Sequence, residues 1–126
     1  MRNVKAAVVS DDLQTVSAHF GMARHYLVYD IEDGAVKGRE VRDKVGHGQG
    51  MHHHEQEGAG ESRLHNTMLA NVADCQAIIA AGMGMPMYAS IVSAGMKAYI
   101  TRIRMADDAV KALAEGTLDN HLEFLH

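Results

Sequence analysis

The stretch Ala77–Ser90, AIIAAGMGMPMYAS, indicates how this chain folds. Its first five residues form a continuous apolar run, which is typical of a strand buried on both faces of a sheet. A glycine turn follows at residues 82–85, and Pro86, which has no N–H to donate, fits the first turn of a helix. The stretch therefore predicts a strand, a turn and a helix. In an open α/β sheet such a turn lies at the carboxyl end of a strand, where ligands usually bind.

Length and composition place the chain in a broad class. Its 126 residues are enough for one domain, and 47% hydrophobic with 22% charged residues is typical of a globular protein. A net charge of −4, without a dense basic cluster, argues against a nucleic-acid partner. No apolar run approaches the roughly 20 residues that span a bilayer. With no secretory signal at the start, we expect a cytoplasmic protein without membrane contact.

Three strands are predicted before the central stretch. Asn3–Val9 is apolar and β-branched, which favours a first strand. His25–Ile31 and Ala35–Val41 flank the turn residues Asp33-Gly34, and Asp-Gly between two strand patterns is the strongest short hairpin signal. The second hairpin strand is polar enough to be an edge strand.

The remaining segments are read from periodicity and capping signals. We expect a helix over Ser62–Ala73, a helix from Pro86 to about Ala94, a strand over Lys97–Thr101, and a helix over Asp108–Glu115 with Asp107 as its cap. Lys44–Glu61, rich in glycine, histidine and glutamate, is predicted to be a flexible loop. The sequence pattern does not predict where the tail, residues 117–126, packs.

This order of elements fixes a topology. The later β-α-β units require parallel strands with right-handed crossovers, whereas the hairpin makes the second strand antiparallel to the first. The prediction is an α/β domain with a five-stranded mixed sheet in the order 3-2-1-4-5.

One edge of that sheet gathers the chemically interesting residues. Strands 1, 3 and 4 would all end there, so the loops that follow them would converge. The first loop carries His19, the second carries several histidines, and the third is the Gly82 turn. Cys75 precedes strand 4 and should lie at the opposite edge. We expect this single cysteine, which permits no internal disulfide, to be a buried small residue rather than a partner of the histidines.

The chain resembles a known family through several motifs in a fixed order. They are His19-Phe20-Gly21, Tyr26–Ile31, Asp33-Gly34, Ile78–Gly84 and Ala94-Gly95-Met96. Together they resemble the dinitrogenase iron–molybdenum cofactor biosynthesis family, which includes nitrogenase cofactor carriers and the orange proteins. The similarity extends from about Val4 to Gly116.

The resemblance implies a fold and a function. The implied fold is a three-layer α/β/α ribonuclease-H-like domain. The implied function is binding or carriage of a metal or metal–sulfur cluster, of iron–sulfur, iron–molybdenum or molybdenum–copper type, rather than catalysis. Partners would be proteins that donate or accept the cluster.

Two groups of residues are candidates for the site. The long loop offers nitrogen donors that suit zinc, copper, nickel or iron, although their spacing matches no standard closed zinc site: His47, His52, His53 and His54. His19, in the HFG motif, is a candidate ligand, and the backbone N–H groups at the helix that follows the turn would stabilise an anionic cluster. The turn residues so assigned are Gly82, Met83, Gly84 and Met85.

Each candidate has a structural alternative. The loop could be solvated with incidental metal affinity, His19 could stabilise its turn, and the methionines could pack in the core. Two other functions also remain open. One is a regulatory or protein-interaction domain without a specific cluster. The other is a metal-dependent hydrolase that uses Asp11 and Asp12, which a turn would explain equally well.

Overall fold

The computed structural model describes residues 3–44 and 68–125. Residues 45–61 of the predicted loop and 62–67 of the predicted helix therefore lie outside the described residues. The part of that helix that is described is helical at residues 68–70 and forms turns at residues 71–74. Among the described residues, no helix has the length and apolar character needed to cross a bilayer.

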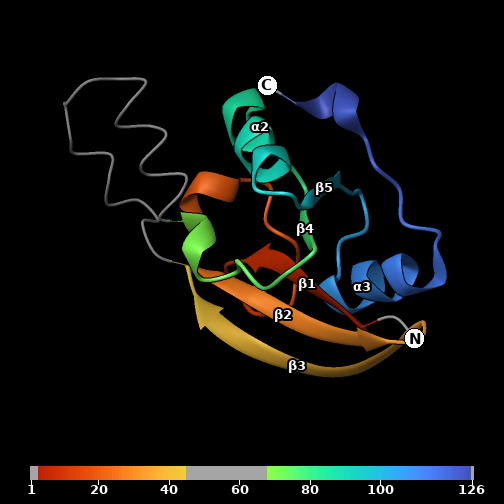
Figure 1. Cartoon of the computed structure of the whole chain (residues 1–126). Coiled ribbons are helices and arrows are strands. Elements are labelled where there is room, and N and C mark those ends of the chain that lie inside the picture. Colours follow the sequence, from red (N-terminus) through yellow and green to blue (C-terminus); the bar gives the residue numbers. More distant parts are fainter. Residues whose placement is uncertain (1–2, 45–67, 126) are drawn as a thin grey trace.

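Five strands and the helices α2 and α3 make up most of the described fold (Figure 1). In chain order the elements are β1 (Asn3–Ser10), η1 (Phe20–Met22), β2 (His25–Glu32), β3 (Ala35–Asp43), β4 (Ala77–Ala80), α2 (Met85–Ser93), β5 (Lys97–Ile100), α3 (Ala106–Glu115) and η3 (Leu122–Phe124).

The sheet has the predicted order, β3-β2-β1-β4-β5. β2 is antiparallel to β1 and to β3, while β4 is parallel to β1 and to β5. β4 is buried throughout and β1 is buried from Ala6 to Ser10, because both faces of these parallel strands are covered there. β3, the outer strand, is mostly exposed, as its polar sequence predicts.

Each face of the sheet has its own apolar core, which gives the three layers. On one face, Val9, Tyr26 and Ile78 pack with Met87 and Ile91 of α2. On the other face, the residues that alternate with these along the strands pack against the buried side of α3. The predicted α/β fold with a mixed five-stranded sheet is therefore confirmed.

One predicted helix start is wrong. α3 begins at Ala106 with Met105 at its N-cap, so Asp107 lies within the first turn and does not cap the helix. The side chain of Asp107 instead accepts a hydrogen bond of 2.6 Å from the Tyr29 hydroxyl. The Asp107 carboxylate, which the sequence predicted as a helix cap, therefore makes a tertiary contact with β2 instead.

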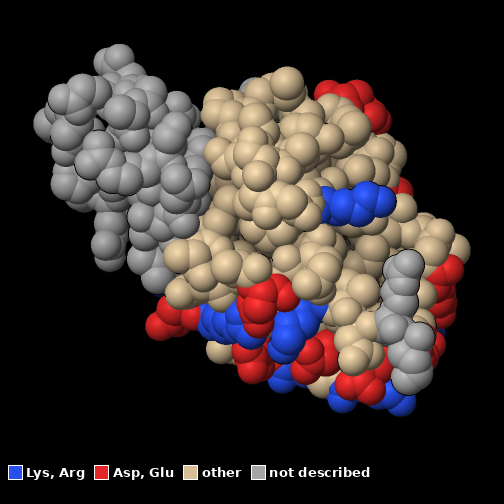
Figure 2. Space-filling model, viewed as in Figure 1, with Lys and Arg blue, Asp and Glu red and all other residues tan. Residues whose placement is uncertain are grey.

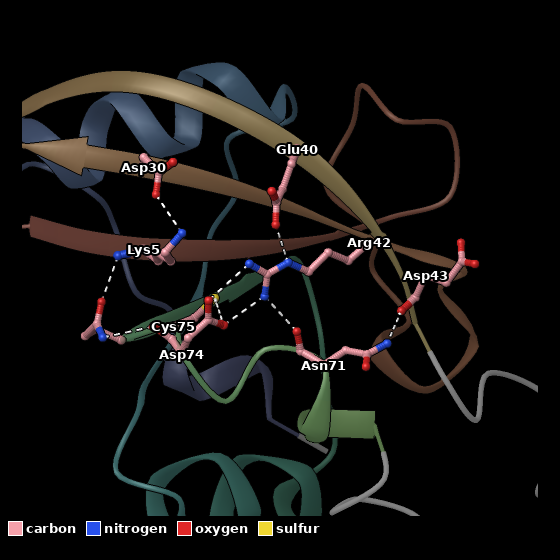
Figure 3. A network of polar contacts seen from close by, with 9 residues as sticks. Lys5, Asp30, Glu40, Arg42, Asp43, Asn71, Asp74 and Cys75 are labelled. Carbon is pink, nitrogen blue, oxygen red and sulfur yellow. Dashed lines mark hydrogen bonds and ion pairs between the residues drawn. The ribbon is translucent and has the colours of Figure 1, made fainter.

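An arginine network holds residues 71–74 against β3, the outer strand (Figure 3). The Arg42 guanidinium donates to both carboxylate oxygens of Asp74, at 2.8 and 3.1 Å, and to the Asn71 carbonyl at 2.8 Å. It also donates to Glu40, and these partners raise the pKa of Arg42 while Arg42 lowers the pKa of Asp74. Bidentate pairing of this kind fixes geometry as well as charge.

The tail, which the sequence left unplaced, covers the outer edge of β5. Ile100 donates its N–H to the Asn120 side-chain oxygen at 2.9 Å, and the Asn120 amide donates to the Ala98 carbonyl at 3.2 Å. The His121 N–H then donates to the Ile100 carbonyl at 2.7 Å. One asparagine side chain therefore takes the place of a strand along an edge that would otherwise be open.

Replacing Asn120 with alanine should open this edge. The Ile100 N–H loses its acceptor, so we expect its amide hydrogen to exchange faster and the free energy of unfolding to fall by about 1–2 kcal/mol. Exchange rates measured by NMR and urea unfolding test this. Glu115→Ala, an exposed change on α3, is the control. An unchanged Ile100 exchange rate in Asn120→Ala would contradict the role of the tail.

Candidate functional site

Three strand ends meet at one edge of the sheet, as the sequence predicted. Ser10 at the end of β1 and Asp43 at the end of β3 both pair with His25, which begins β2. β4, parallel to β1, ends beside them and leads into the glycine turn. The loop that carries His19, the start of the long loop and the Gly82 turn therefore leave from the same edge (Figure 1).

Backbone contacts join the first of these loops to the glycine turn. Ser17 donates its N–H to the Val9 carbonyl at 2.8 Å, and its own carbonyl accepts from the Ala81 N–H at 2.9 Å. The next residue, Ala18, lies against Gly82 so closely that a Cβ on Gly82 would stand 2.6 Å from the Ala18 carbonyl oxygen. Only glycine permits this approach, so the turn and the His19 loop form one unit.

Asp11 shapes the backbone on both sides of His19. Its carboxylate accepts the Arg24 N–H at 3.2 Å and the Ser17 hydroxyl at 3.3 Å. The Ser17 hydroxyl oxygen in turn accepts the His19 N–H at 3.1 Å. The position of His19 is thus set by a chain of hydrogen bonds that begins at the end of β1.

Asp12 is occupied in the same loop. It accepts from the backbone N–H groups of Gln14 and Thr15 and from the Thr15 hydroxyl, at 2.7 to 3.0 Å, and these bonds hold the pKa of its carboxyl well below the usual range. Asp11 and Asp12 therefore have the contacts of turn-forming residues, which is the structural alternative to the hydrolase hypothesis.

His19 presents an exposed imidazole at this edge. Its carbonyl accepts from Met22 and Ala23, which closes the short helix η1, so its backbone is fixed. Among the described residues its ring makes no hydrogen bond or ion pair. The geometry leaves the ring nitrogens of His19 available to a ligand.

The methionines of the turn divide into two kinds. Met83 is 1% exposed and belongs to the core beneath α2, as the packing alternative predicts, so its thioether is covered by protein. Met85, the first residue of α2, is 55% exposed. What the turn offers to a ligand is therefore its backbone and the Met85 side chain.

The four loop histidines, His47, His52, His53 and His54, lie outside the described residues. Within residues 3–44 and 68–125, no three histidine, cysteine or acidic side chains lie close enough to hold a metal ion. Of the predicted metal ligands, His19 is the one whose position is described.

Cys75 lies where the sequence placed it. It is 3% exposed and precedes β4, at the end of that strand opposite the Gly82 turn. Burial raises the pKa of the Cys75 thiol to about 12. With its side chain covered by protein, Cys75 packs in the core on the α2 face of the sheet.

Two residues at this edge were not singled out by sequence reasoning. The Nδ1 atom of His25 is buried without a hydrogen bond in the described part of the chain, 3.7 Å from an Asp43 carboxylate oxygen. Lys44, read from the sequence as the first loop residue, is fully buried. The neighbouring sequence does not indicate that either side chain is buried. His25 begins a strand and Lys44 begins a glycine-rich segment, and both positions predict exposure.

Comparison with known proteins identifies the family. The family Nitro_FeMo-Co, described as dinitrogenase iron-molybdenum cofactor, matches residues 2–116. The chain belongs to this family. Membership connects the chain with the biosynthesis or carriage of the iron–molybdenum cofactor.

Two related sequences and one solved structure are similar to the chain. The chain is 32% identical to protein NifX of Sinorhizobium fredii over 97 residues, 72% of this chain and 55% of NifX, so it spans about half of that protein. It is 27% identical to an uncharacterized protein of Methanocaldococcus jannaschii over 108 residues, 86% of this chain and 84% of that protein. The apo orange protein of Desulfovibrio gigas shares its fold, with a TM-score of 0.65 at 15% identity over 94% of this chain and 92% of that chain.

Substituting Gly82 tests the join between the turn and the His19 loop. In Gly82→Ala the new methyl group meets the Ala18 carbonyl oxygen, and the two backbones must separate. We expect the free energy of unfolding to fall by about 1–3 kcal/mol, measured by urea denaturation.

Gly21→Ala is the matched control, because a Cβ on Gly21 meets nothing within 4 Å. We expect its free energy of unfolding to change by less than about 1 kcal/mol. Equal stability of Gly82→Ala and Gly21→Ala would show that the close approach does not constrain the loop.

Proposed function

We propose that this protein binds and carries a metal–sulfur cluster, of iron–sulfur, iron–molybdenum or molybdenum–copper type, as cargo in cofactor biosynthesis or delivery. The observation that carries the proposal is the close packing of the His19 loop against the Gly82 turn, at the carboxyl ends of β1 and β4. Ligands of open α/β sheets bind at this position. Family membership supports the same class of cargo.

The donor set favours a cluster that is already assembled. A bare metal ion needs about four protein or water ligands, and the described residues offer one exposed imidazole, that of His19. A metal–sulfur cluster brings most of its donor atoms as sulfide. It therefore needs few ligands from the protein, and these residues fit such a cargo.

The start of α2 suits the charge of that cargo. Gly84 is the N-cap and has no side chain to donate to or accept from the first turn, so the N-cap position itself provides no side-chain cap. Backbone N–H groups and the helix dipole stabilise anions at such an end. We propose His19 as the coordinating side chain and residues 82–85 as the backbone cradle. Contributions from the loop histidines stay a prediction.

The surface beside this site suits a protein partner. No lysine, arginine, aspartate or glutamate occurs from Cys75 to Met96, and Figure 2 shows the surface over α2 without charged residues. Met22, Met85 and Val92 are each at least half exposed. Exposed apolar patches mark interaction sites, which supports contact with a protein that donates or accepts the cluster. A cytoplasmic location remains a prediction from the sequence.

Anaerobic expression with iron, molybdenum and copper supplied tests the proposal. We expect a coloured protein with near-integral metal and acid-labile sulfide. In His19→Ala we expect roughly tenfold or greater loss of cluster affinity, because a ligand should matter at least as much as the groups that orient ligands. Metal and sulfide analysis with visible spectroscopy measures this.

His121→Ala is the control, since this histidine lies in the tail and bonds to Asp119 and Glu123. We expect its cluster content to equal that of the unaltered protein. A colourless protein that also fails to take up a supplied cluster would overturn carriage. The exposed surface over α2 would then favour the alternative, a protein-interaction domain.

A further inference from the structure

Lys44 is a buried cation at the edge that holds the proposed site. It directly follows Asp43, the last residue of β3, and its N–H donates to the Arg24 carbonyl at 3.0 Å. The side chain of Asp43 is 90% exposed, whereas Lys44 has no exposed surface. The chain therefore turns the Lys44 side chain inward at the point where β3 ends.

The surroundings of the Lys44 ammonium are apolar. Its Nζ lies 5.1 Å from the centre of the Phe20 ring and 3.7 Å from the Met68 sulfur. Phe20 and Met68 belong to the core, and Phe20 is the central residue of the HFG motif. The ammonium thus lies on the inner side of the loop that presents His19.

This cation has no carboxylate partner in the described part of the chain. Asp11 is the one charged group there that acts on it, at more than ion-pair distance, and it raises the pKa of Lys44. Burial outweighs that effect and lowers the pKa from 10.5 to about 8. Arg42, two residues earlier on β3, is by contrast bound to Asp74 and Glu40 (Figure 3).

A buried charge without a counterion destabilises the folded chain, and a methionine or leucine would fill the same space without that penalty. Aromatic rings and thioethers attract an ammonium only weakly. A positive charge at a ligand-binding edge gains its counterion when an anion binds. Among the described residues, no stabilising partner accounts for an ammonium at this position.

We propose that Lys44 supplies the positive charge by which this site recognises an anionic ligand. This inference rests on the proposed function and specifies the charge of the cargo. The ammonium lies behind Phe20, so its charge attracts an anion at this edge through the weakly screening interior of the protein, without direct contact.

Binding of tetrathiomolybdate, a compact sulfur-rich dianion, tests the charge requirement. Equilibrium dialysis at pH 7 without oxygen compares the unaltered chain with Lys44→Met and Lys44→Arg. We expect Lys44→Met to bind roughly tenfold more weakly or worse, because the attraction of a buried positive charge is lost, and Lys44→Arg to retain most of the affinity. Lys97→Met, an exposed lysine that begins β5, should bind normally.

The protonation of Lys44 gives a second readout. We expect saturating tetrathiomolybdate to raise the pKa of Lys44 above about 8, followed by NMR of the lysine side chains. Affinity should then fall as the pH rises past 8, because the free protein loses the ammonium. We expect Lys44→Met to unfold at the same or a higher temperature than the unaltered chain. If Lys44→Met does not fold, the affinity of Lys44→Arg and the NMR titration of Lys44 test the proposal.

Three results would overturn the proposal: equal affinity in Lys44→Met, an unchanged Lys44 pKa at saturation, or no binding of tetrathiomolybdate at millimolar concentration. Uptake of a cluster to the same level in Lys44→Met would refute the role of Lys44 and leave carriage intact. A raised Lys44 pKa with tetrathiomolybdate, in a protein that takes up no cluster, would refute carriage and retain the anion site.

Discussion

The close approach of the Ala18 carbonyl to Gly82 is the contact on which the site depends. It brings a loop after β1 against the turn after β4, and the hydrogen bonds of Ser17 to Val9 and Ala81 hold the two together. The backbone of His19 is consequently positioned by the central parallel strands and not by the loop alone. A site on such rigid elements keeps its geometry before any ligand arrives, so less ordering entropy is lost on binding.

Arg42 and Lys44, two cations near the end of β3, have different surroundings and different roles. Arg42 is surrounded by carboxylates and fixes residues 71–74 over the sheet. Lys44 is surrounded by a ring and a thioether, and nothing in the described chain neutralises it. In a protein with a net charge of −4, a buried cation at this edge creates a local preference for anions that the overall charge opposes.

The sequence predicted the strand order and most element bounds because these depend on local signals. The Asp33-Gly34 turn, the apolar run at Ala77–Ala81 and the glycine that ends each helix all act within a few residues. It failed where a distant group decides the outcome. Asp107 bonds to Tyr29, and Asn120 completes the edge of β5. Lys44 packs against Phe20 and Met68. The residues next to Asp107, Asn120 and Lys44 in the sequence do not indicate these contacts. The convergence at the sheet edge was predictable because it follows from topology.

A carrier must release what it binds, and the composition of this edge is consistent with release. A closed set of thiolate ligands is typical of structural metal sites, and the one cysteine of the chain is buried at the opposite edge. In the proposed site, one imidazole, backbone amides and a shielded ammonium would bind through contacts that another protein's ligands can replace one at a time. The uncharged surface over α2 lies beside that edge, so a partner that docks there would reach the ligand directly. Weak coordination of the cluster and an apolar surface next to the site would thus both serve the transfer of the cluster to a partner protein.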